Sequence, residues 1–198
     1  ATRRTASAAN SGSIMRLMLD LSGGLTPDET IRLCDRWEKY DILFVEEPAD
    51  PADIGALKRI AQAISIPIAA GERFYTRHDF RDALEGRAMD IAQPDIGNTG
   101  GIMETKKIAA MAEAYGLRVQ PHICGGPIAT AAALQIDACI PNFMIQELYP
   151  YRPRALFDLV DDAPDARVAN GRMPIPRRPG LGVALRRDHA APFVWAEC

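Results

Sequence analysis

Six polar residues recur at nearly even intervals along the chain, and each stands at the end of a short apolar run. Successive members are 23 to 27 residues apart: Asp20, Glu46, Glu72, Asp95, His122 and Glu147. In a (β/α) barrel, one strand with its helix takes up about 25 residues, and the carboxyl ends of the strands meet at one mouth, where active sites are built. The spacing therefore predicts that the six side chains share a cavity.

Three of the six, Asp20, Glu46 and Glu72, are carboxylates on neighbouring predicted strands. Held at one mouth, they would repel one another unless a cation compensated their charge. An all-oxygen set with room for water and substrate suits Mg²⁺ better than zinc, which usually recruits Cys or His. We therefore expect a magnesium site at the mouth. The next residue, Glu47, points the other way in an alternating strand, so we interpret it as a structural or supporting acid.

A candidate base follows on the next two predicted strands. Asp95 lies on the strand before the one that ends in His122, so its carboxylate can fix the tautomer and the orientation of the imidazole. A histidine after an apolar run is by itself more often structural, but the register shared with five other strand ends favours a general base. Such a site suits removal of a proton next to a carboxylate, with Mg²⁺ neutralising the enediolate and a protonated Glu147 donating a hydrogen bond to it.

The elements that must position these groups alternate between short apolar runs and amphipathic stretches. The apolar runs predict strands at 16–19, 42–45, 66–69, 90–92, 117–119 and 143–145. This alternation is typical of a parallel α/β sheet. Thr26 and Glu29 form a capping-box pattern that opens a helix running to about Tyr40, and Asp50-Pro51 is predicted to open the next helix. We expect an incomplete TIM-type (β/α) barrel with about six βα units visible.

The composition is that of a globular enzyme with a real core, since 47% of the residues are hydrophobic, 25% are charged and the net charge is −3. Basic residues are spread among the acids, so we expect no nucleic-acid and no membrane partner. The four cysteines lack C-x-x-C spacing, which indicates free thiols and a cytoplasmic location. We interpret residues 1–14 as a flexible leader, 15–150 as the barrel portion and 151–198 as a tail that packs on the barrel.

Six stretches of the sequence follow one another over residues 16–147: LMLDLSGG, FVEEP, GERFYTR, QPDIGNTGGIMETKKIAAMAEAYG, VQPHICGGPIATAAALQIDA and FMIQE. In this order and spacing they resemble the enolase superfamily in its mandelate racemase and muconate lactonizing branch, and within it the galactonate-type sugar-acid dehydratases. The resemblance implies a Mg²⁺ ion, with the following protein groups around it: the metal ligands Asp20, Glu46 and Glu72, the base dyad Asp95 and His122, and Glu147 as the hydrogen-bond partner on the enolate side.

Two further residues are candidate substrate contacts. Arg73, next to Glu72, either contacts substrate or pairs with an acid at the rim. Ser22 stands two positions after the first implied metal ligand, where dehydratases that this chain resembles often carry a histidine that assists the leaving hydroxyl. This departure leaves the identity of the general acid open.

The function that the resemblance implies is Mg²⁺-dependent removal of the α-proton of a small carboxylate, most simply the dehydration of a sugar acid. The alternatives are a racemase, epimerase or cycloisomerase of the same superfamily, and, in another class, an inactive fragment or assembly subunit that retains the metal site. The family also has an N-terminal capping domain and two earlier barrel strands, for which this chain is too short. We therefore expect a homo-oligomer or completion by a missing N-terminal segment.

Overall fold

The computed structural model describes residues 15–149, 151 and 153–193, so the predicted leader, residues 1–14, lies outside the described residues. The strands of the described part are β1 (Met18–Asp20), β2 (Phe44–Glu46), β3 (Ile68–Ala70), β4 (Ile91–Ala92) and β5 (Arg118–Val119). Its α-helices are α1 (Pro27–Trp37), α2 (Ile54–Ala63), α3 (Arg77–Glu85), α4 (Ile102–Ala114), α5 (Pro127–Asp137), α6 (Arg154–Phe157) and α7 (Arg187–Ala190). Its 3-10 turns are η1 (Glu38–Tyr40), η2 (Pro164–Arg167) and η3 (Ala191–Phe193).

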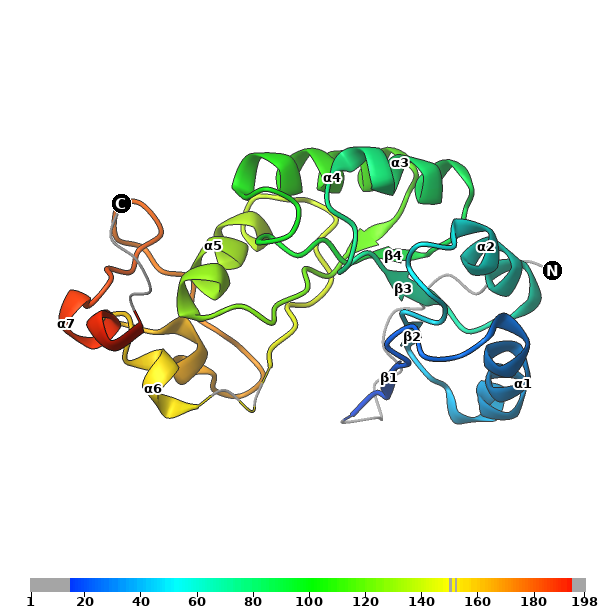
Figure 1. Cartoon of the computed structure of the whole chain (residues 1–198), viewed down its shortest axis with the longest axis horizontal. Helices are drawn as coiled ribbons and strands as arrows, with labels where there is room; N and C mark the ends of the chain where they lie inside the picture. Colours follow the sequence, from blue (N-terminus) through cyan, green and yellow to red (C-terminus); the bar gives the residue numbers. More distant parts are fainter. Residues whose placement is uncertain (1–14, 150, 152, 194–198) are drawn as a thin grey trace.

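The five strands form one parallel sheet in which every strand pairs with its sequence neighbour, in the order β1-β2-β3-β4-β5. Helices α1 to α4 follow one another along the outer side of this sheet (Figure 1). A doubly wound sheet would reverse its strand order and carry helices on both faces. The unbroken order with helices on one side is instead that of a section of barrel wall, as the sequence predicts.

The observed strands are shifted by one or two residues relative to the predicted ones, and one predicted strand is wrong. The run predicted at 143–145 is not a strand among the described residues; it touches β5 through a single parallel bridge between Val119 and Phe143. Two backbone bonds accompany that bridge, from the Val119 amide to the Asn142 carbonyl and from the Met144 amide to the Val119 carbonyl. Because β5 itself has only two residues, the ladder beside it is too short to count as a sixth strand.

The main core lies between the sheet and the outer helices. It contains fully buried residues from both layers, among them Val45 and Ile68 from strands and Ile60, Phe80 and Ile108 from helices. The other face of the sheet carries a small cluster of three buried residues, Phe44, Ala69 and Ile91. Leu19 of strand β1 packs against the main core, whereas Met18 and the preceding Leu17 are 42% and 52% exposed. The sheet therefore ends at an open, apolar edge.

The helix starts show which local signals decide their position. Thr26 and Glu29 form the predicted capping box of α1, and η1 extends it to Tyr40. The prediction that Asp50-Pro51 opens the next helix is wrong, because Asp53 caps α2 by accepting a hydrogen bond from the Ala56 amide. Asp50 instead accepts a bond from the Ala52 amide within the preceding turn, a local alternative that aspartate offers the backbone.

The segment after residue 153 lies against the end of the sheet section that carries α5 (Figure 1). Thr130 on α5 donates to Asp165 at 2.7 Å, and Gln135 on α5 donates to the Pro176 carbonyl at 3.3 Å. A two-pronged ion pair between Asp161 and Arg178 closes the segment on itself. Within the described residues, no helix has the length and apolar character needed to cross a membrane.

Candidate active site

His122 and Asp95 form a hydrogen-bonded dyad at adjacent strand ends. The two residues face each other in a parallel bridge just beyond β4 and β5, and His122 Nδ1 lies 2.7 Å from Asp95 Oδ2. Asp95 Oδ1 accepts bonds from the amides of Gly97 and Asn98, which anchor the carboxylate from the other side. Both residues are buried. The carboxylate therefore fixes which imidazole nitrogen faces away from it, namely Nε2.

The surroundings of the dyad shift the protonation of both partners. Burial lowers the pKa of His122, but the hydrogen bond to Asp95 and the charges of Glu147 and Glu72 outweigh it and raise that pKa to about 8. Burial raises the pKa of Asp95, yet the bond to His122 and the Asn98 and Gly97 amides bring it below its ordinary value. The pair is therefore an ionised carboxylate that stabilises an imidazolium, which is what a general base needs after it takes a proton.

Glu72 stands on the open side of the imidazole. Its Oε2 lies 3.2 Å from His122 Nε2, and its Oε1 lies 3.1 Å from Arg73 Nε. Asn98 holds the same turn by donating from its side chain to the Glu72 carbonyl at 2.9 Å. Arg73 thus pairs with an acid at the rim, which is one of the two arrangements expected for it.

Glu46 and Asp20 lie side by side at the ends of β2 and β1, paired in register. Glu46 is buried; that burial, with the charges of Glu147, Asp20 and Glu72, raises its pKa to about 7. Asp20 accepts bonds from the Ser22 amide at 2.6 Å and the Ser22 hydroxyl at 2.8 Å. Ser22 therefore donates hydrogen bonds to the carboxylate of Asp20 in this structure.

The donor set fits a magnesium ion by its chemistry, although its side chains do not converge on one point. Among the described residues, no group of three His, Cys, Asp or Glu side chains is close enough together to hold an ion. Two of the three carboxylates are turned to protein partners, Glu72 to His122 and Asp20 to Ser22. Besides burial, the charges of the neighbouring carboxylates raise the pKa of Glu46. A divalent cation would relieve this mutual repulsion.

Glu147 completes the polar cluster from beyond β5. Burial raises its pKa, as do the charges of Glu72 and Asp20, while His122 opposes that rise. Its Oε2 is buried without a hydrogen-bond partner in the described structure. A carboxyl with a raised pKa and an unpartnered buried oxygen can donate a hydrogen bond when it is protonated.

The structure adds one supporting residue that the sequence did not predict, Asn98, and the partners of another, Glu47. Asn98 holds the Glu72 turn through its side chain, and the signal for it was only its place in a glycine-rich turn after Asp95. Glu47 was expected to be a supporting acid, but its partners could not be read from the sequence. They are the Gly71 amide at 2.9 Å and Arg73 at 3.7 Å.

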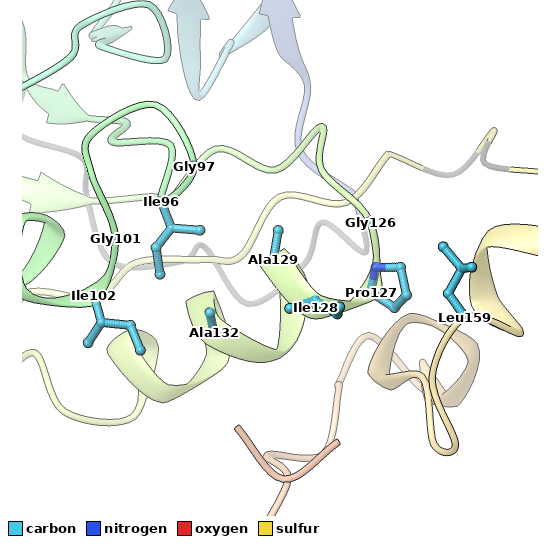
Figure 2. Close-up of a pocket in the computed structure, with 10 residues that line it drawn as sticks. All are labelled: Ile96, Gly97, Gly101, Ile102, Gly126, Pro127, Ile128, Ala129, Ala132 and Leu159. Carbon is cyan, nitrogen blue, oxygen red and sulfur yellow. The ribbon is translucent and has the colours of Figure 1, made fainter. Parts of the chain in front are cut away.

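An apolar groove lies next to this cluster and is distinct from it in character. Figure 2 shows its lining, in which Ile96, Gly97, Gly101 and Ile102 face Gly126, Pro127, Ile128, Ala129, Ala132 and Leu159. The groove has a volume of about 440 Å³ and carries no titratable side chain among these residues. Polyhydroxylated acids need hydrogen-bond partners, so we do not assign their binding to this groove.

The sequence matches one family model and several curated proteins over most of its length. The model of the family described as enolase C-terminal domain-like matches residues 2–189. D-xylonate dehydratase of Haloferax volcanii is 37% identical over 169 residues, which cover 85% of this chain and 40% of that protein. D-galactonate dehydratase of Ralstonia pickettii is 39% identical, with 88% and 47% covered. D-galactarolactone cycloisomerase of Agrobacterium fabrum is 35% identical, with 92% and 50% covered.

The fold is also similar to that of solved structures. A crystal structure of a Mesorhizobium loti protein superposes with a TM-score of 0.87 at 49% sequence identity, covering 95% of this chain and 50% of that one. The chain thus spans about half the length of the relatives that it matches.

Proposed function

The chain belongs to the enolase C-terminal domain-like family, and we propose that it carries the proton-abstracting site of a sugar-acid dehydratase, a hydro-lyase. One observation carries this proposal. The His122–Asp95 dyad presents its outer nitrogen, Nε2, to the carboxylate of Glu72, within a cluster of acids at consecutive strand ends. The names of two curated relatives, D-xylonate dehydratase and D-galactonate dehydratase, support the choice of substrate class.

The residues that would hold the metal are Asp20, Glu46 and Glu72. Their all-oxygen donor set suits Mg²⁺. They lie at the ends of β1 and β2 and in the turn after β3, which are three neighbouring strands of the sheet. When bound there, Mg²⁺ supplies positive charge that makes the α-proton of a carboxylate substrate more acidic.

The dyad performs the proton transfer in this proposal. His122 Nε2 takes the α-proton, and Asp95 keeps Nδ1 protonated and stabilises the imidazolium. Glu147, in its protonated form, donates a hydrogen bond to the oxygen on which negative charge develops. The β-hydroxyl then leaves as the electron pair of the broken C–H bond forms the C=C bond of an enol. The imidazolium of His122 returns its proton to that hydroxyl, which departs as water.

The alternative function with the same first step is isomerisation. It is supported by the name of one relative, D-galactarolactone cycloisomerase. Both reactions begin with removal of the α-proton, so the roles of His122 and Asp95 are the same in each. They differ in the next step, because a dehydratase must also expel a hydroxyl. The product, a 2-keto acid after dehydration, distinguishes them.

We also propose that activity requires cover for the β1 edge, either by a second copy or by a preceding segment of a longer polypeptide. The exposed Leu17 and Met18 support this, as does the share of the relatives' length that the chain spans. Among the described residues, Cys34 and Cys139 are free thiols, which supports a cytoplasmic location for the protein.

The test is an assay of the chain, in the presence of Mg²⁺, against D-galactonate, D-xylonate and D-galactarolactone. Formation of a 2-keto acid is followed by its reaction with semicarbazide and by NMR. The proposal expects 2-keto product from at least one sugar acid and loss of that product in His122→Asn. Formation of an isomerised lactone without any 2-keto product would contradict the dehydratase proposal and support the isomerase instead.

A further inference from the structure

Glu47 ties together the loops that follow the first three strands. Its amide donates to the Ala69 carbonyl at 3.0 Å, and its carbonyl accepts from the Gly23 amide at 2.8 Å. Its side-chain Oε1 accepts from the Gly71 amide at 2.9 Å. These bonds lie beside Asp20 and Glu46, which end β1 and β2, and beside Glu72, which follows β3. A single residue outside that set therefore holds all three loops in place.

The carboxylate of Glu47 is 1% exposed, so its second oxygen must also find compensation inside the protein. That oxygen, Oε2, accepts no hydrogen bond and lies 3.7 Å from Arg73 Nε. The same nitrogen lies 3.1 Å from Glu72 Oε1. Arg73 is therefore shared between the buried carboxylate of Glu47, which the Gly71 amide holds, and the carboxylate of Glu72, which faces His122.

The linked side chains form a continuous series from β2 to the dyad. Glu47 contacts Arg73, Arg73 contacts Glu72, Glu72 Oε2 lies 3.2 Å from His122 Nε2, and His122 is bound to Asp95. Each contact in this series joins opposite charges when the imidazole is protonated. The position of Glu72 beside the imidazole thus depends on an anchor outside the dyad.

The backbone around the anchor is strained and tightly packed. Glu47 has a φ of +40°, which is uncommon for a residue with a side chain. Gly71 has a φ of +126°, and a Cβ there would stand 2.6 Å from the ring of Phe80, which is fully buried. Strain of this kind persists only where the surrounding contacts hold it, and it gathers at functional sites.

We propose that Glu47 is a positioning residue whose carboxylate, acting through the Gly71 amide and the Arg73 guanidinium, sets where the Glu72 carboxylate lies relative to His122. This inference rests on the proposed function for the roles of Glu72 and His122. The competing interpretation is that Glu47 only stabilises the fold. The two differ in whether a change at Glu47 reaches the imidazole.

The test compares Glu47→Gln and Arg73→Gln with the wild type. Asp137→Asn is the matched control, because Asp137 is also a buried acid changed to its amide, and no hydrogen bond joins its side chain to the site. The readouts are the Hε1 NMR resonance of His122, the dissociation constant for Mg²⁺ by calorimetry, and the melting temperature. The chain has three histidines, so the His122 resonance is identified by its loss in His122→Asn.

Both Glu47→Gln and Arg73→Gln are expected to move the His122 resonance and to weaken Mg²⁺ binding by about tenfold or more, while Asp137→Asn changes neither. A lower melting temperature in Glu47→Gln, with the His122 resonance and the Mg²⁺ affinity unchanged, would overturn the proposal. If Glu47→Gln does not fold, Arg73→Gln is judged by the same criteria. A wild type without Mg²⁺ binding would contradict the magnesium part of the proposed function, and the resonance alone would then decide the positioning role.

Discussion

Glu72 and His122 face each other across the mouth of the sheet, with Glu72 Oε2 3.2 Å from His122 Nε2. Glu72 follows β3 and His122 follows β5, so the contact passes over the strand between them. Asp95, which follows that intervening strand β4, lies behind the imidazole and binds its Nδ1. The Nε2 atom of His122 is thereby oriented toward Glu72, one of the implied metal ligands.

The first prediction concerns magnesium. A ligand that binds the folded state alone stabilises it by about 2.7 kcal/mol at roughly 100 times its dissociation constant, so Mg²⁺ should raise the melting temperature of the wild type. In Glu72→Gln this rise should shrink sharply. Glu104→Gln is the matched control, since Glu104 also pairs with an arginine, Arg77, outside the site. An equal response to Mg²⁺ in Glu72→Gln and the wild type would remove Glu72 from the ligand set.

The second prediction concerns pH and Asp137. Burial raises the pKa of Asp137 to about 7, and neither of its oxygens has a hydrogen-bond partner. Because the folded pKa lies above the ordinary value of 3.8, the favourable protonated state is fully present below that value and is lost as the pH rises through 7. Asp137→Asn should therefore be more stable than the wild type at pH 8, by on the order of 1–3 kcal/mol.

This difference is measured by thermal or denaturant unfolding of both proteins between pH 4 and pH 8. The advantage of the asparagine variant should grow as the pH increases. An advantage that is equal at both ends of the range would mean that the pKa of Asp137 is the same in the folded and the unfolded state, which would contradict the raised pKa.

The third prediction compares two glycines. Gly71→Ala would place a Cβ against the buried Phe80 ring at a φ of +126°, so it should destabilise the fold by about 3 kcal/mol or more. Gly116→Ala is the matched control, with a φ of +77° and no atom within 4 Å of the added Cβ. It should cost only about 1–2 kcal/mol. Equal losses in urea unfolding would show that the Phe80 contact yields without cost.

The features that could be predicted from the sequence are those set by the βα repeat or by bonds between residues close in sequence. The even spacing of the strand-end residues was enough to predict the parallel sheet and the Asp95–His122 pair, because the βα repeat fixes which residues come to the mouth. The capping box at Thr26 was also readable, since both of its bonds are local in sequence. The choice of Asp53 over Asp50 as the α2 cap was not, because either aspartate can bind a nearby amide.

Side-chain directions within the mouth were beyond the sequence. The spacing placed Glu72 near the other acids, but it contained nothing to indicate that its carboxylate turns to His122 and Arg73. The support from Glu47 depends on Gly71, which lies 24 positions away and belongs to another strand end. The predicted strand at 143–145 failed because an apolar run is not sufficient for a strand; it also needs a partner long enough to form a ladder, and β5 has two residues.

The fourth prediction concerns the edge of the sheet. Within the described part of the chain, strand β1 pairs with β2 alone, and its Met18 is exposed, as are the preceding Met15 and Leu17. Unpaired strand edges with apolar side chains tend to associate. In sedimentation velocity the purified 198-residue chain should form dimers or larger species, and Leu17→Lys with Met18→Lys should reduce them. A monodisperse monomer that binds no apolar dye would contradict this prediction.

The central claim is that His122 takes the α-proton of a sugar acid, and the most direct measurement is hydrogen–deuterium exchange at that carbon. The chain is incubated with D-galactonate and Mg²⁺ in D₂O, and the α-proton signal, together with that of any product, is followed by ¹H NMR. We predict loss of the α-proton signal with the wild type and a rate lower by about 10²–10⁴-fold with His122→Asn, the usual effect of losing a general base. Exchange by His122→Asn at the wild-type rate would contradict the assignment of His122 as the base.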